Sequence, residues 1–285
     1  MMWMTRAYSM AGRYAEALKL SDQTLERQKA NLPPNHAFIL RSMLIRSGIY
    51  SGLGRRADAL QLREEVLPLM QARLGPDNPV TLMGMSFLAE SYAGAGRQSE
   101  ALKLCEEALE KSKLKLGPDN PETVQRVAVL VESLIAGDRG SEAVPLIDEY
   151  VGRAEGKNFP PATIPRARLI ELRLRHFEKN KDAAGCRATA EMWERLNRTD
   201  ANSLYNAACF RAVTAAAVKV DPNIPARDAA RLAQEQADLA IAWLHKAVAA
   251  GFMSVEHVKK DTDVDSLRGR EDFKELMAEV QAKKK

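Results

Sequence analysis

Apolar residues recur along this chain at intervals of three and four positions. One such stripe lies within Pro79–Gly94 and a second within residues 99–115. The two stripes consist of Met85, Leu88, Ala89 and Tyr92, and then of Ala101, Leu102, Cys105, Ala108 and Leu109. This spacing places the apolar side chains on one face of an α-helix. Because Gly94 and Gly96 separate the stripes, the pattern predicts a helical hairpin.

The hairpin pattern returns every 42 residues. A Gly-Arg pair, followed by an acidic residue and then by alanine and leucine, begins at Gly12, Gly54 and Gly96. A weaker version, with aspartate for glycine and valine for leucine, begins at Asp138. Four positions before each stand Tyr8, Tyr50, Tyr92 and, in the fourth unit, Leu134. Agreement of several features at one interval predicts an array of helical repeats.

The string LGPDNP joins successive hairpins at residues 74–79 and 116–121. Gly117 suits the left-handed conformation in which many helices end. Asn120 can cap the next helix, and Pro121 fits its first position, where a missing N–H costs nothing. The string is therefore expected to end one helix and begin the next. Looser versions occur at residues 32–36 and 158–161.

The repeats divide the chain into four regions. Residues 1–157 hold four 42-residue units, and residues 158–199 hold a degenerate fifth unit in which Gly185 replaces the usual alanine. Residues 200–253 form a sixth unit with an insertion near 220–236, expected to be a loop before a lengthened helix. Residues 254–285 are expected to form a small helical cap and a basic tail. The first unit starts in mid-helix, which favours the hypothesis that the chain is a fragment of a longer protein.

Tyr92, Leu88, Ala89, Ala101 and Ala108 stand at the spacing of the tetratricopeptide repeat signature. With its 42-residue period and LGPDNP connector, the chain resembles the long-repeat subclass found in kinesin light chains. That resemblance implies an all-α fold, a right-handed superhelical α-solenoid of stacked antiparallel helix pairs. It also implies that the first helix of each pair lines the concave side.

A second resemblance concerns the C-terminal third. The strings TDANSLYNAACFRAV, AWLHKAVAAGF and DTDVDSLRGREDFKEL resemble the C-terminal end of planctomycete-type bacterial serine/threonine kinases that carry tetratricopeptide repeats. In that family the kinase domain precedes the array. The resemblance implies that this chain is a partner-recruiting arm whose catalytic domain would lie upstream.

Composition agrees with a foldable, water-soluble protein. Of the 285 residues, 46% are hydrophobic and 28% charged, too apolar for intrinsic disorder. Three widely spaced cysteines favour a reduced cytoplasmic setting. No stretch reaches membrane-spanning length, and the first residues lack the pattern of a secretory signal. We therefore expect a cytoplasmic protein that makes no membrane contact.

Motifs for catalysis or metal binding are weak. The string AGAGRQ lacks the third glycine and the preceding strand of a nucleotide loop, and no His-Arg-Asp kinase motif occurs. The string DTDVDSLRGRED has Ser266 where a calcium loop needs glycine, and Asp272 where it needs a bidentate glutamate. The histidines and Cys105 lack partners at catalytic or metal-ligand spacing. We expect no enzymatic activity, cofactor or metal.

Basic residues are densest at residues 166–181. Arg168 and Arg175 share one helical face, and Arg166 and Arg173 share another. A solvated helix surface is the favoured interpretation, and phosphate binding is the alternative. A formal net charge of +4 is a small excess, so nucleic-acid binding is disfavoured.

The resemblance to tetratricopeptide arrays also implies which residues face a partner. These are Arg41, Leu44, Gly48 and Ser51 in one unit; Met83, Ser86, Glu90 and Ala93 in the next; and Gln125, Ala128, Glu132 and Ile135 in the third. Arg41 and Phe87 are the expected anchors. Kinesin-light-chain repeats often carry paired asparagines at the positions that Ser86 and Phe87 occupy here. Because this chain lacks those asparagines, apolar packing is favoured over clamping of a peptide backbone.

The sequence thus predicts a noncatalytic scaffold that binds a peptide or protein in its concave groove. The alternatives are a C-terminal arm of a serine/threonine kinase and, less favoured, a nucleic-acid binder. Because residues 1–10 offer no polar cap, self-association through the uncapped N-terminal repeat is a further expectation.

Overall fold

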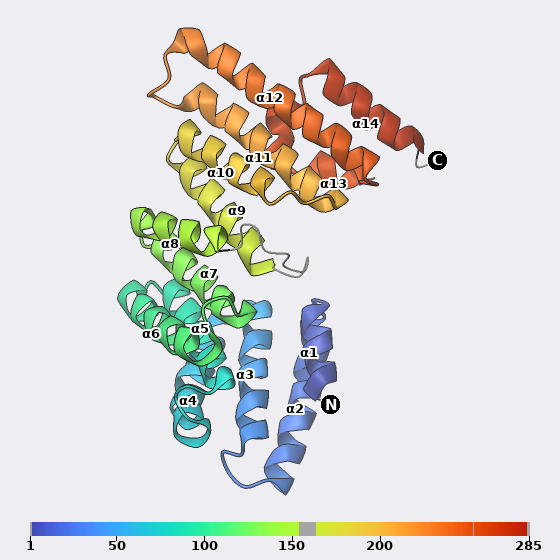
Figure 1. Ribbon diagram of the computed structural model, residues 1–285. Coiled ribbons are helices and arrows are strands. Elements are labelled where there is room, and N and C mark those ends of the chain that lie inside the picture. Colours follow the sequence, from blue (N-terminus) through green and yellow to red (C-terminus); the bar gives the residue numbers. More distant parts are fainter. Residues whose placement is uncertain (1, 154–163, 253, 284–285) are drawn as a thin grey trace. The chain divides into compact units, whose positions relative to one another are not determined.

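The computed structural model describes residues 2–153, 164–252 and 254–283, which are helical apart from short turns (Figure 1). None of these residues lies in a strand, so the predicted all-α class is confirmed. The helices are α1 (Met2–Met10), α2 (Tyr14–Asn31), α3 (Ala37–Gly52), α4 (Arg56–Leu74), α5 (Pro79–Gly94), α6 (Gln98–Leu116), α7 (Pro121–Ala136), α8 (Gly140–Gly152), α9 (Ile164–Lys179), α10 (Ala183–Arg195), α11 (Ala201–Val220), α12 (Ala226–Ala249), α13 (Val255–Lys260), the 3₁₀-helix η1 (Thr262–Leu267) and α14 (Glu271–Lys283).

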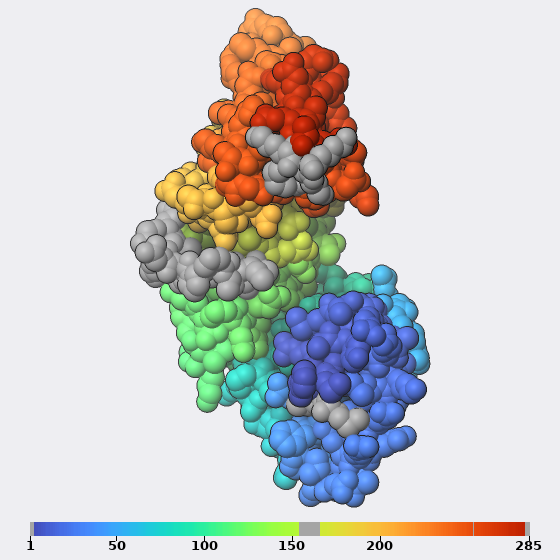
Figure 2. All heavy atoms as spheres, turned by 90° about the vertical axis from the view of Figure 1, so that its right-hand side faces the viewer, coloured from blue at the N-terminus to red at the C-terminus, as the bar shows by residue number. Residues whose placement is uncertain are grey.

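The chain forms two compact units, one ending at Leu146 and the other starting at Ile147. In the first unit, α1 pairs with α2, α3 with α4, and α5 with α6. Each pair also packs on the next, because α3 contacts both α1 and α5, and α5 contacts α7. This is the predicted stack of antiparallel helix pairs, and α1 lies at the surface that faces the viewer in Figure 2.

The connectors act as helix punctuation. The side chains of Asn78 and Asn120 each accept a 2.9 Å hydrogen bond from the backbone N–H two residues further on. Pro79 and Pro121 occupy the first helical position. In the looser connector before α3, His36 Nδ1 accepts from the Phe38 N–H at 3.2 Å. The predicted caps are therefore confirmed, whereas the connector expected at residues 158–161 lies outside the described residues.

The backbone conformation of the connector glycine differs from the predicted left-handed one. Gly117 follows α6 with φ 85° and ψ 157°, and Gly75 follows α4 with φ 95° and ψ 152°. These angles are not those of the left-handed helix, for which ψ is near 50°. The chain is extended at positive φ, a region that is essentially restricted to glycine. The extension carries the chain away from the helix end toward the capping asparagine.

A second recurring contact explains the Tyr…Gly-Arg motif. The Arg97 N–H donates to the Tyr92 carbonyl at 2.8 Å, and its guanidinium lies 4.0 Å from the centre of the Tyr92 ring. The same guanidinium bonds Glu100 at the start of α6. Equivalent ring contacts join Arg13 to Tyr8 and Arg55 to Tyr50, at 4.5 and 4.4 Å. The motif therefore fastens the tight turn inside each hairpin.

An alanine seam runs through the hairpins at the 42-residue interval. Ala17, Ala59, Ala101 and Ala143 are each no more than 1% exposed, as expected where two helices approach closely. The fifth member of the series is Gly185. A Cβ atom at Gly185 would overlap the Phe177 ring, so glycine makes room for this aromatic side chain.

The second unit contains α9 to α14. Helices α11 and α12 have 20 and 24 residues and are joined by a turn at residues 221–225. Asp221 organises this turn, because its carboxylate accepts from the N–H groups of Asn223 and Ala183. At the C-terminal end, η1 packs on α11, and α14 packs on α12 and α13.

The basic stretch in α9 is not a uniformly solvated surface, and that expectation is wrong for two of its arginines. Arg166 and Arg173 are only 5% and 8% exposed. Arg173 bonds Asp148 at 2.8 Å and also contacts Thr189, while Arg166 donates to the Tyr150 carbonyl at 3.3 Å. The face that carries these arginines is buried because α8 and α10 pack against it.

Candidate partner-binding surfaces

The predicted groove residues lie on α3, α5 and α7, the first helices of three successive pairs. Those most accessible to a partner are Arg41, Ser51, Glu90 and Gln125, all of which are exposed. Half-buried positions are Gly48, Met83, Phe87, Ala93, Glu132 and Ile135. Since α3 contacts α5 and α5 contacts α7, the exposed positions lie along one stacked set of helices.

Three of the predicted groove residues are buried instead. Leu44 and Ala128 are each 1% exposed, and Ser86 is 8% exposed. Leu44 belongs to a core cluster with Leu40 and Met70, and Ser86 donates its hydroxyl to the Leu82 carbonyl at 3.3 Å. These helices pack on neighbours on several sides, which leaves a narrower exposed strip than helical spacing alone suggests. The three side chains are therefore part of the core.

The predicted anchor Phe87 is also partly committed to the fold. Its ring packs against the core cluster around Leu44, and the Arg63 guanidinium lies 5.3 Å from the ring centre. Arg41, the other predicted anchor, is exposed in the first turns of α3. A partner could reach Arg41 directly, but only the outer part of Phe87.

Arg63 is the residue that sequence reasoning missed. It extends from α4 between α3 and α5, and it is 5% exposed. Its guanidinium donates to Ser47 (3.1 Å), Ser51 (3.0 Å), Ser91 (2.6 Å) and the Phe87 carbonyl (2.7 Å). The signal was present in the sequence, because the equivalent positions in neighbouring units hold the uncharged residues Ser21 and Cys105. Arg63 thus joins α4 to α3 and α5 and bonds two of the predicted groove residues, Ser51 and Phe87.

Two acidic residues lie on this surface in addition to Arg41. Glu90 and Glu132 occupy the same repeat position on α5 and α7, 42 residues apart. Desolvation by surrounding protein raises the pKa of Glu90; Arg63 opposes this shift, and Glu132 adds to it. Glu90 nevertheless remains exposed to solvent. The two carboxylates are therefore close enough to influence each other.

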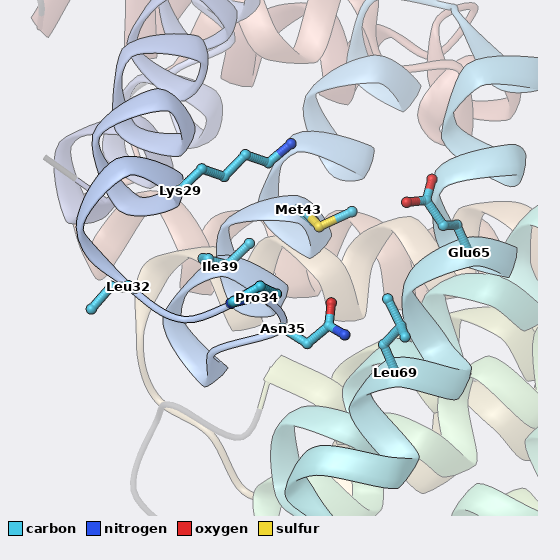
Figure 3. A pocket seen from close by; sticks show the side chains of 8 residues that line it. All are labelled: Lys29, Leu32, Pro34, Asn35, Ile39, Met43, Glu65 and Leu69. Carbon is cyan, nitrogen blue, oxygen red and sulfur yellow. The ribbon is translucent and has the colours of Figure 1, made fainter.

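A separate cavity of about 310 Å³ lies between α2 and α4, over α3 (Figure 3). It is lined by Lys29, Leu32, Pro34, Asn35, Ile39, Met43, Glu65 and Leu69. Figure 3 shows Lys29 entering from α2, and Glu65 and Leu69 from α4. The apolar residues form most of the lining, and the two charged side chains stand on opposite sides.

The next hairpin shows why this cavity is apolar. One repeat further on, Leu69 is replaced by Lys111, whose ammonium bonds Glu107 at 2.7 Å. Ile39 is replaced by Thr81, whose hydroxyl contacts the Met70 carbonyl at 3.4 Å. In that hairpin the Lys111–Glu107 ion pair runs along α6, and the Lys111 ammonium also lies 4.0 Å from Asp77 in the connector. Four of the eight lining positions differ one repeat further on: Lys29, Asn35, Ile39 and Leu69 correspond to Gln71, Asp77, Thr81 and Lys111. The last two of these changes replace an apolar side chain by a polar one.

The three cysteines are poor candidates for a catalytic nucleophile. Cys105, Cys186 and Cys209 are free and buried. Burial raises the pKa of Cys105 to about 11 and that of Cys186 to about 12, so neither is a ready thiolate. Within residues 2–153, 164–252 and 254–283, no group of three metal-ligating side chains could hold an ion, and no helix is both long and apolar enough to cross a bilayer.

Two segments of the chain match known repeat sequences. Residues 4–37 and 46–113 each match a sequence model described as a tetratricopeptide repeat. The sequence has no match among curated proteins.

Solved structures give the same result for the fold. The nearly identical TPR-like repeats of a Podosopora anserina protein designated a kinesin light chain align with a TM-score of 0.57 and 22% identity, over 69% of this chain and 91% of that one. BtubC (BKLC) from P. vanneervenii aligns with a TM-score of 0.55 and 16% identity, over 83% of this chain and 91% of that one. The kinase resemblance of the C-terminal third has no counterpart in these matches. Residues 4–37 and 46–113 thus match tetratricopeptide repeats, within a fold similar to that of kinesin-light-chain-like repeat arrays.

Proposed function

We propose that this protein is a noncatalytic scaffold that binds a peptide or protein segment along α3, α5 and α7. The observation that carries the proposal is the strip of exposed polar side chains on these helices: Arg41, Ser51, Glu90 and Gln125. Stacked helices of this kind present a continuous surface on which an extended segment or a helix can lie. The similarity to tetratricopeptide repeats supports the same conclusion, because such repeats commonly bind proteins.

The charge of the strip specifies the partner. Glu90 and Glu132 lie on adjacent helices; Glu132 raises the pKa of Glu90, and the Arg63 guanidinium lowers it. An arginine or lysine of the partner would offset the repulsion between these two carboxylates. We therefore infer a partner segment with a basic residue at this point and uncharged residues beside the half-buried Phe87 and Met83.

A peptide array tests this proposal directly. The full chain, fluorescently labelled, is applied to ten-residue peptides of systematically varied charge. We expect binding to favour peptides with a central Arg or Lys, and the double variant Glu90→Gln/Glu132→Gln to bind them at least about tenfold more weakly. The difference in affinity between the two proteins should decrease at high salt, since charge pairs at a surface are screened.

The matched control removes the same charge elsewhere in unit 1. Glu106 and Glu110 are exposed on α6, the second helix of its pair. The variant Glu106→Gln/Glu110→Gln should bind like the unmodified protein. Equal weakening in both double variants, or binding without preference for basic peptides, would contradict the assigned surface.

A second proposal rests on the C-terminal sequence. The strings within residues 187–279 favour a role as the partner-recruiting arm of a serine/threonine kinase. Coding sequence for a kinase domain directly upstream and in frame would support this role. A phosphotransfer assay on this chain alone should give no signal above background; activity would contradict the noncatalytic assignment.

Self-association, cytoplasmic location and the absence of nucleic-acid binding remain predictions. Trp3 and Met10 on α1 are 74% and 78% exposed, so an apolar surface is available for a second copy. Sedimentation of the full chain over a range of concentrations tests self-association. Electrophoretic shifts with labelled RNA at two salt concentrations test nucleic-acid binding.

A further inference from the structure

The second unit contains a cavity of about 310 Å³ that the proposed scaffold function does not use. It lies where α9, α11 and the segment from α13 to η1 meet. Its floor consists of Trp193, Tyr205, Cys209 and Phe210, which are all between 3% and 5% exposed. Its rim carries polar and charged side chains, among them Asp261. The cavity thus combines an aromatic floor with a carboxylate.

Asp261 receives hydrogen bonds from uncharged donors. Its Oδ2 accepts from the Tyr205 hydroxyl at 2.8 Å and from the Cys209 thiol at 3.7 Å, and its Oδ1 accepts from the Asp263 N–H at 3.0 Å. Burial raises the pKa of both Tyr205 and Cys209, so each keeps its proton and acts as a donor. These donors orient the carboxylate but leave its negative charge unneutralised.

The other acids that line the cavity already have cationic partners. Asp263 forms a bidentate pair with Arg175, at 2.6 and 2.7 Å. Glu171 pairs with Arg168 at 3.2 Å. By contrast, the ion-pair partner of Asp261 among the described residues is His257, 3.7 Å away and charged only when protonated.

One more cation lies near Asp261 without neutralising it. Arg268 donates to the Asp261 backbone carbonyl at 2.8 Å, and its charge is matched by Asp265, 2.6 Å away. The cavity therefore carries one more negative than positive charge at neutral pH when these pairs are taken together. An anion would be repelled, whereas a cation would complete the set.

The aromatic side chains favour an organic cation in particular. Tyr205 stacks on Phe252 with 4.3 Å between ring centres, and the His257 ring meets Tyr205 edge-on at 5.4 Å. Trp193 and Phe210 lie 5.2 Å apart in the floor. Aromatic surfaces bind guanidinium and alkylammonium groups, which are less strongly hydrated than metal ions and carry an apolar stem.

We propose that this cavity binds a guanidinium or alkylammonium group, with Asp261 as its counter-ion and Tyr205 and Trp193 as its aromatic surface. The group is either a free small amine or an arginine side chain presented by a peptide. The inference is independent of the proposed groove, because all residues of the cavity belong to the second unit.

Calorimetric titration of the full chain tests the proposal with three probes: agmatine, N-acetylarginine amide and the uncharged analogue N-acetylcitrulline amide. We expect saturable binding of one or both cations and at least about tenfold weaker binding of the citrulline compound. Binding of agmatine alone would identify a free amine as the ligand. Preference for the arginine derivative would identify a peptide side chain.

The variant Asp261→Asn removes the charge while keeping the cap of η1, because asparagine caps helices as well as aspartate does. It should weaken cation binding at least about tenfold. The control Glu235→Gln removes a charge from the exposed face of α12, outside the cavity lining, and should change binding less than about twofold. The double variant Glu90→Gln/Glu132→Gln should leave cation binding unchanged, and this result would distinguish the cavity from the proposed groove.

A second variant tests the same site if Asp261→Asn fails to fold. His257 is exposed, and lysine at this position would place an ammonium beside Asp261. His257→Lys should therefore abolish cation binding with no loss of helical circular dichroism. Three results would overturn the proposal: no saturable binding of either cation, equal binding of the citrulline analogue, or undiminished binding by Asp261→Asn.

Discussion

At the scale of the residue, the first unit buries the charged guanidinium of Arg63. It joins α4 to both α3 and α5 through hydrogen bonds to three serines and one carbonyl. Burial lowers its pKa, and Glu90 opposes that shift. Arg63 therefore links the packing of three helices to the charge of Glu90.

We expect Arg63→Met to destabilise the protein by about 1–3 kcal/mol. Methionine keeps most of the apolar stem but leaves buried acceptors without a donor. Chemical denaturation followed by circular dichroism measures the change. Arg56→Met, at an exposed position on the same helix, should leave the denaturation midpoint unchanged. Equal stability of the two variants would show that the Arg63 network is not important for folding.

The burial of the three cysteines leads to a separate prediction. Because burial raises the pKa of Cys105 to about 11 and of Cys186 to about 12, the folded thiols stay protonated at pH 8. A disulfide reagent should therefore label none of the three cysteines rapidly until urea is added, and all three afterwards. The folded state also holds these protons more tightly than the unfolded state, so stability should fall as the pH rises above about 9. Rapid labelling at pH 8 without denaturant would contradict the burial.

At the scale of the element, helix ends are decided by short-range chemistry. Gly117 ends α6 with φ 85° and ψ 157°, and no other atom lies within 4 Å of where a Cβ would stand. Gly94 ends α5, has the same free space and does not have a positive φ. The two positions therefore differ in backbone conformation and not in crowding.

Substitution of these two glycines by alanine tests the backbone conformation of the connector. Gly117→Ala should destabilise the protein by about 1–3 kcal/mol, since alanine is strained at these angles. Gly94→Ala should be neutral or stabilising by up to about 1 kcal/mol, because alanine restricts the unfolded chain. Thermal unfolding of both variants checks the prediction. A stable Gly117→Ala protein would mean that the connector adopts another conformation.

At the scale of the whole molecule, most contacts join helices that are neighbours in the chain. Each compact unit therefore has its own core. Arrays of this kind need not unfold in one step, because each repeat is stabilised mainly by its neighbours. Trp193 and Trp243 report on the second unit, and Ala101 lies in the seam of the first.

We expect Ala101→Leu to cost about 1–3 kcal/mol through overpacking, since Ala101 is fully buried. In a Trp3→Phe background, the variant should lower the urea midpoint seen by circular dichroism. The fluorescence transition of Trp193 and Trp243 should change little. Lys103→Leu, exposed on the same helix, is the control. An equal shift in both signals would show that the units unfold together, and an unchanged dichroism midpoint would mean that the seam is misplaced.

The sequence by itself determined the helical hairpins, their period and their punctuation. These features depend on contacts between residues close in the chain, such as the cap from Asn78 to Val80 and the turn from Tyr92 to Arg97. Local contacts leave a readable pattern because the same residue types recur at the same spacing. The all-α class followed from that pattern.

Only the tertiary structure decided which side chains on those helices reach the surface. Leu44, Ser86 and Ala128 are buried and Arg166 and Arg173 are enclosed, because neighbouring helices cover more than one face of each helix. Burial of this kind depends on residues far apart in sequence, and Arg63 reaches a carbonyl 24 residues away. The cavity at Asp261 has the same origin, since Tyr205 and Asp261 are 56 residues apart and meet only when α11 packs on η1.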